Sequence, residues 1–131
     1  MAPELKYLLF SVILCFGQVV VLAVAATGQV GLPSLAGNRE GLPELTGWAG
    51  RARRAHANMV ENLVLFAALV LVAVVAQKTS ALTATGAALF FWARLVFAAV
   101  YIAGIPWLRT AVWFVSIVGI AMIAWALLAA L

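Results

Sequence analysis

The chain has few residues of the kinds that usually perform catalysis or bind metals. Its 131 residues include one cysteine, one histidine and four acidic residues, and only 9% of the residues are charged. The single cysteine, Cys15, excludes an internal disulfide. One cysteine and one histidine are also too few for a structural zinc site, so no metal centre is expected.

Hydrophobic residues dominate the composition instead. They make up 67% of the chain, and they occur in long blocks rather than in alternation with polar residues. Soluble domains contain only roughly 45–50% apolar residues, so the composition predicts an all-α polytopic membrane protein. The net charge of +4 does not indicate nucleic-acid binding, because the basic residues form no soluble patch and no nucleic-acid-reading motif is present.

Four apolar blocks are each long enough to cross a hydrocarbon core of about 30 Å at about 1.5 Å per residue. We expect a single domain, residues 1–131, with one long connection that is rich in glycine and proline. The alternative for the first block is a cleaved signal peptide, but the block is longer than the ~7–15 apolar residues typical of one. The four expected transmembrane helices span about residues 5–26, 47–77, 81–103 and 107–130.

The basic residues predict the orientation of these spans. The side of the membrane that holds the long connection has five arginines, and the opposite side has Lys6, Lys78 and the terminal amine. The positive-inside rule therefore places the long connection in the cytoplasm and both termini on the other side of the membrane. The alanine-rich chain, without an endoplasmic-reticulum retention signal, favours a bacterial inner membrane. The arginines in or beside the first and third connections are Arg39, Arg51, Arg53, Arg54 and Arg109.

Residues 48–64 concentrate the polar side chains of the chain. They include three arginines, one histidine, two asparagines and one glutamate at the head of an apolar run. Spacings of three and four place side chains on one face of a helix, and His56 lies off the resulting stripe. Charge inside a membrane is costly and rarely lacks a function. The stripe contains Arg51, Arg54, Asn58, Glu61, Asn62 and Leu65.

Glu61 and Arg94 are expected at the same depth in the membrane. Glu61 lies ten residues after Arg51, and Arg94 lies ten residues before Gly104. Both are therefore about 15 Å from the cytoplasmic interface by helical rise. An unpaired charge there is costly, so we expect the two side chains to pair within a subunit or across an interface. A purely structural ion pair is an equal alternative on this observation alone.

Arginines outnumber the acids available to balance them in this half of the bundle. Glu61 is the only interior acid expected there, and guanidinium groups pair well with carboxylates, so the cluster predicts a pocket for a small acidic molecule. The alternative is a solvated patch that sets topology, which accounts for Arg53 and can extend to Arg51 but does not explain Arg94. The clustered arginines are Arg51, Arg54, Arg94 and Arg109.

Two segments combine charged and aromatic residues in a specific pattern. They are R-A-R-R-A-H-A-N-M-V-E-N at residues 51–62 and A-R-L-V-F-A-A-V-Y at residues 93–101, and Arg109 follows after a short break. This pattern resembles the MAPEG family, the membrane-associated proteins in eicosanoid and glutathione metabolism. The resemblance covers essentially the whole chain. It implies four-helix subunits that assemble as a homotrimer, with glutathione bound at the cytoplasmic side between adjacent subunits.

The resemblance also implies roles for single residues. Arg109 would favour the nucleophilic thiolate as a fixed cation beside the sulfur, and Tyr101 would donate a hydrogen bond nearby or simply pack between helices. His56 resembles a histidine typical of the family, and its place off the stripe favours a structural hydrogen bond. Arg51 joins the glutathione-binding set through the arginine cluster. The binding positions implied by the family are Arg54, Asn58, Glu61, Arg94, Tyr101 and Arg109.

The implied activity is a glutathione transferase, or a glutathione-dependent peroxidase or isomerase, whose thiolate attacks a lipophilic electrophile from the bilayer. The alternative is a non-catalytic binding or scaffold protein of the same fold, although retention of Arg94, Glu61 and Arg109 favours the enzyme. A small transporter subunit is disfavoured, because no inverted repeat is present. The chain departs from residues typical of some members at Ala57, Phe97, Ala98 and Trp113.

Overall fold

The computed structural model describes all 131 residues, which form helices and no strands. A short helix, α2 (Leu32–Ala36), lies in the long connection. Each of the four long helices is long and apolar enough to span a membrane, which confirms the predicted number of spans. In chain order these helices are α1 (Pro3–Val30), α3 (Gly47–Val75), α4 (Ala81–Ala103) and α5 (Pro106–Leu128).

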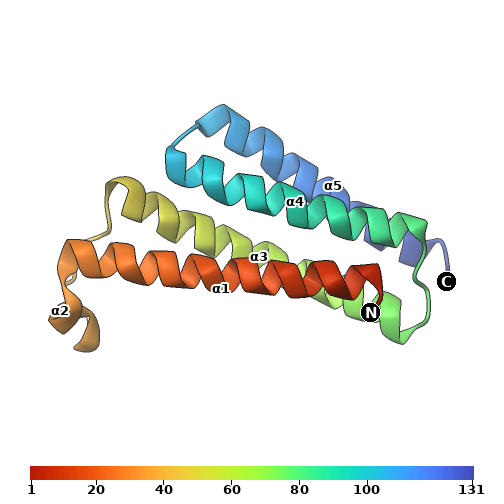
Figure 1. The fold of residues 1–131 in the computed structure, drawn as a ribbon, viewed down its shortest axis with the longest axis horizontal. Helices are drawn as coiled ribbons and strands as arrows, with labels where there is room; N and C mark the ends of the chain where they lie inside the picture. Colours follow the sequence, from red (N-terminus) through yellow and green to blue (C-terminus); the bar gives the residue numbers. More distant parts are fainter.

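The four long helices are antiparallel to their neighbours in sequence (Figure 1). In Figure 1, α1 and α3 form one pair, and α4 and α5 form another. Both termini lie at one end of the bundle, and the long connection and the turn between α4 and α5 lie at the other. All five arginines of the first and third connections therefore belong to the same end of the molecule.

The first helix is longer than expected from sequence. It ends at Val30 rather than near residue 26, and its C-cap is Gly31 at φ 84. Gly28 within this stretch is helical despite the low helix propensity of glycine. α1 ends at Gly31, whose positive φ is a backbone conformation that glycine adopts readily.

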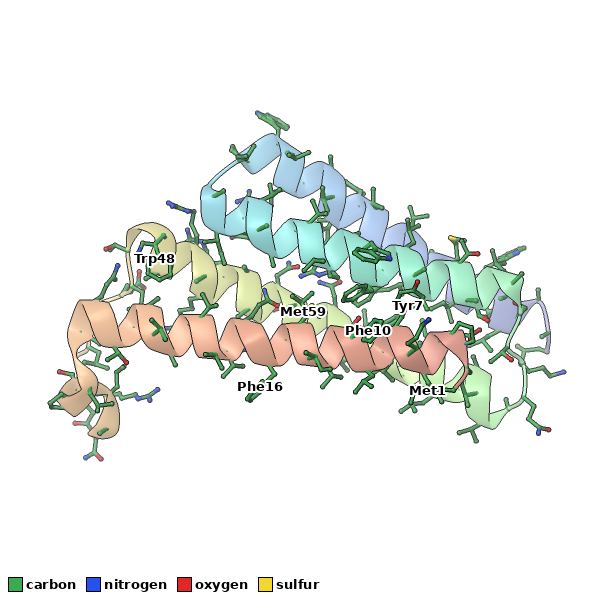
Figure 2. All side chains as sticks on the ribbon, viewed as in Figure 1. Met1, Tyr7, Phe10, Phe16, Trp48 and Met59 are labelled. Atoms are coloured by element: carbon green, nitrogen blue, oxygen red, sulfur yellow. The ribbon has the colours of Figure 1, made fainter.

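α1 buries three polar side chains in its first two-thirds and exposes many of its large apolar ones. Glu4, Ser11 and Gln18, spaced seven residues apart, are all buried against the other helices. Figure 2 shows Phe16 on the side of α1 that faces away from the bundle, and 68% of this residue is exposed. This inverted pattern suits a helix surrounded by lipid, where polar groups seek other helices.

α4 and α5 approach each other most closely at two glycines. A Cβ atom placed on Gly86 would lie 2.7 Å from the carbonyl oxygen of Gly119, and one on Gly119 would lie 2.6 Å from that of Gly86. Phe66 and Phe90 stack beside this contact with ring centroids 4.0 Å apart. Small residues thus allow two spans to pack backbone against backbone, as the sequence predicts.

Candidate functional site

Tyr101 is the residue at which predicted site residues from three helices meet. Its hydroxyl accepts a hydrogen bond from Nε of Arg54 on α3, with a distance of 3.2 Å. The guanidinium carbon of Arg109 on α5 lies 4.6 Å from the centroid of the Tyr101 ring. Two cations therefore contact one phenol, and the ring quadrupole favours the one above its face.

A cavity of about 270 Å³ opens beside Tyr101. Three predicted site residues line it together: Asn58, Tyr101 and Arg109. Helical spacing would have identified two further lining residues, because Phe97 lies four residues before Tyr101 and Trp113 four residues after Arg109. From sequence, Phe97 and Trp113 stand out only as departures from family members, and Thr110 is not predicted as a site residue. The lining residues not predicted as site residues are Phe97, Thr110 and Trp113.

The start of α5 adds positive potential to this cavity. α5 begins at Pro106, and no side chain caps its N-terminus, so its first backbone N–H groups are not bonded within the helix. The helix dipole places partial positive charge at the same end as Arg109. Helix N-termini of this kind bind carboxylates and other anions. The cavity therefore lies beside a guanidinium and within one turn of the positive end of a helix dipole.

Arg51 contacts the end of α4 rather than the cavity. Its Nε donates a hydrogen bond of 2.9 Å to the carbonyl oxygen of Ile102. Its guanidinium also lies beside Gly104, whose φ of 85 ends α4. Basic side chains commonly satisfy the last carbonyls of a helix in this way. The structure thus gives Arg51 a helix-capping contact.

Arg94 and Glu61 do not pair within one chain. Arg94 is 1% exposed, none of its three guanidinium nitrogens has a hydrogen-bond partner, and its guanidinium carbon lies 4.1 Å from the centroid of the Phe97 ring. Glu61 is exposed. The intrasubunit form of the predicted pair is therefore wrong. Glu61 and Arg94 were expected at the same depth, but their side chains do not point toward each other. Asn62, the next residue, faces the interior, and Glu61 is turned about 100° away from it.

The acid buried within a single chain is Glu4, not Glu61. Glu4 is 2% exposed and accepts a hydrogen bond from Oγ1 of Thr83. It lies near the N-terminus, at the end of the bundle opposite the arginines. The carboxylate of Glu4 is thus too far along the bundle to balance Arg54 or Arg109. The excess of positive charge around Tyr101 remains.

His56 belongs to a different surface from Tyr101. It is half-buried and lines a cavity of about 610 Å³ between α1, the long connection and α3. Arg53, Arg39 and Glu44 line the same cavity, together with apolar residues of α1. The separation agrees with the prediction that His56 lies off the stripe of Arg54 and the other polar residues.

The model of the MAPEG family matches residues 5–129, nearly the whole chain. The chain belongs to the MAPEG family. The matched region includes both segments that indicated this family from sequence and every residue of the Tyr101 cavity. Comparisons of this MAPEG chain with curated proteins and with solved structures gave no match.

Proposed function

We propose that this MAPEG protein is a membrane-embedded glutathione transferase that activates the glutathione thiol for attack on a lipophilic electrophile. Peroxidase and isomerase reactions would use the same thiolate. The observation that supports the proposal is the contact of Arg54 with the Tyr101 hydroxyl and of Arg109 with the Tyr101 ring, beside a cavity with no acidic lining residue. Such a site favours an anionic ligand.

The chemistry of glutathione suits this arrangement. Glutathione has two carboxylates, which guanidinium forks and helix N-termini bind well. Asn58 offers both an amide donor and an amide acceptor to its peptide groups. Arg109, at the start of α5, would stabilise a nearby thiolate and so lower the pKa of the thiol.

Tyr101 would act as a hydrogen-bond donor to the thiolate. Its oxygen accepts from Nε of Arg54, so its own O–H proton is free to point elsewhere. The contact with a cation also makes the phenol a stronger donor, because charge-assisted hydrogen bonds polarise the groups they join. Arg109 and Tyr101 are therefore the proposed catalytic residues.

The proposed assembly is a homotrimer with its sites between adjacent subunits. Glu61 is exposed on α3, ten residues after Arg51. Its exposed apolar neighbours are Val60, Val64 and Leu65. A carboxylate facing lipid about 15 Å from the interface would be costly, so this face needs a polar cover. A neighbouring subunit would supply it, and Glu61 would then face the ammonium of glutathione or a cation across the interface.

The proposed location is a bacterial inner membrane with the Tyr101 cavity on the cytoplasmic side. The arginines in or beside the long connection and the turn between α4 and α5 gather at one end of the bundle, and Lys6 and Lys78 lie at the other. The positive-inside rule assigns the arginine-rich end to the cytoplasm. Glutathione would reach the cavity from that side, and the electrophile would arrive through the bilayer.

Conjugation of glutathione to a generic aromatic electrophile, followed with the purified protein in detergent, tests the proposal. We expect turnover by the wild type, little turnover by Arg109→Ala, and unchanged turnover by Lys78→Ala, which removes a cation at the opposite end. Glutathione binding without any turnover would instead support the alternative of a non-catalytic scaffold. Absence of both binding and turnover would contradict both.

A further inference from the structure

Phe97 separates two features of the molecule that have complementary chemistry. One is the Tyr101 cavity, whose wall includes the Phe97 ring. The other is the guanidinium of Arg94, which lies 4.1 Å from the centroid of the same ring. Arg94 itself does not line the cavity. A single phenyl ring thus stands between a site suited to anions and a cation that has no acidic partner within one chain.

Arg94 is in an unfavourable environment in this arrangement. It is almost completely buried, within a membrane-spanning helix, and all three of its guanidinium nitrogens lack a hydrogen-bond partner. Stacking on the Phe97 ring compensates only in part, since a cation–π contact is much weaker than the hydrogen bonds and hydration that burial removes. A carboxylate that reached Arg94 would therefore gain a strong, charge-assisted pair.

The Phe97 ring can admit such a carboxylate by turning about its side-chain bonds. One side of the residue borders the 270 Å³ cavity, which offers space for the ring, and an edge contact of 5.4 Å between centroids links it to Tyr101. A ligand held by Arg109 and Tyr101 would thus lie next to the ring that covers Arg94.

We propose that Phe97 is a gate that determines the specificity of the site for thiols. The ring covers Arg94 until a ligand with a second carboxylate displaces it, and that carboxylate then pairs with Arg94. The inference rests on the proposed function and adds a selection rule to it. A thiol with two carboxylates, one for the Arg109 end and one for Arg94, is preferred over a thiol with one.

Calorimetric titration of the purified protein with glutathione and with its monoethyl ester, which lacks one carboxylate, tests the gate. The wild type should bind glutathione several-fold more tightly than the ester. Phe97→Ala removes the ring that must be displaced, so it should tighten glutathione binding several-fold and affect the ester little. In the double variant Phe97→Ala with Arg94→Met this gain should disappear.

Two further variants separate the gate from simple changes of cavity size or fold. Trp113→Ala enlarges the same cavity without uncovering Arg94, and it should leave the preference for glutathione over the ester unchanged. Arg94→Lys retains the charge and should retain most of that preference, which distinguishes loss of the cation from loss of folding.

The gate is overturned if Phe97→Ala weakens glutathione binding, or if its effect is the same with and without Arg94, because Phe97 is then only a wall. These results would leave the proposed function intact as long as the wild type binds glutathione. If the wild type binds neither glutathione nor the ester, the proposed function and the gate fail together.

Discussion

Tyr101 accepts a hydrogen bond of 3.2 Å from Arg54 while its ring faces Arg109 at 4.6 Å. This relationship joins α3, α4 and α5 at the arginine-rich end of the bundle. It also leaves the phenolic proton available for a ligand. The proposed chemistry of the site depends on this triplet more than on any single charge.

Tyr101→Phe should impair thiolate formation more than it impairs glutathione binding. The change keeps the ring beneath Arg109 and removes only the hydroxyl, so a hydrogen bond to a charged group worth about 1.5–3 kcal/mol is lost. Measured kcat should fall, with a smaller change in KM. Tyr7→Phe removes the other tyrosine hydroxyl, in the N-terminal half of α1, and should have no effect on either constant. Equal losses in both variants would contradict a specific role for Tyr101.

Arg109→Lys should retain part of the activity that Arg109→Ala abolishes. A lysine keeps the positive charge near the thiol but lacks the planar fork that pairs with a carboxylate. We therefore expect a higher KM for glutathione with a measurable kcat. Steady-state kinetics with an aromatic electrophile would show this split. A lysine variant as inactive as the alanine variant would indicate that geometry, rather than charge, is essential.

Gly119→Ala should destabilise the protein by about 1–3 kcal/mol, as overpacking in a tight core does. The added Cβ atom would lie 2.6 Å from the carbonyl oxygen of Gly86, so α4 and α5 would have to separate. Thermal unfolding in detergent measures the effect. Gly17→Ala is the matched control, because nothing lies within 4 Å of a Cβ atom there. A normal unfolding temperature for Gly119→Ala would contradict the close helix contact.

Glu61→Leu should weaken the proposed homotrimer. If a neighbouring subunit covers this face, the substitution removes a polar group that the interface uses, and light scattering in detergent should show dissociated subunits. Val64→Ala, on the same exposed face, is the control and should leave the oligomer intact. If Glu61→Leu raises stability without changing the oligomer, the carboxylate faces lipid, and the proposed interface is wrong.

The number of spans and the arginine-rich end were predictable from sequence, because hydrophobic blocks and charge positions do not depend on how the helices rotate. The rotation of each helix is what sequence could not supply. Glu61 and Arg94 lie at similar predicted depths, yet one is exposed and the other is buried. One helical position decides this difference, since Asn62 occupies the inward direction that Glu61 was expected to share.

Part of the site was predictable from helical spacing alone. Asn58, Tyr101 and Arg109 do share a cavity, and the spacing of four residues from Tyr101 and Arg109 extends it to Phe97 and Trp113. Contacts that depend on the backbone conformation at the end of a helix were not predictable. The capping contact of Arg51 is one of these, because it requires the turn at the end of α4.

The most direct test of the central claim is the ultraviolet difference spectrum of glutathione added to the purified protein near neutral pH. The claim is that the cations around Tyr101 bind glutathione and stabilise its thiolate. We predict a thiolate absorbance band that saturates with glutathione, and no band with Arg109→Ala even at the higher glutathione concentrations that saturate its weaker binding. Saturable binding with no thiolate band in the wild type, or an equal band in Arg109→Ala, would contradict the account.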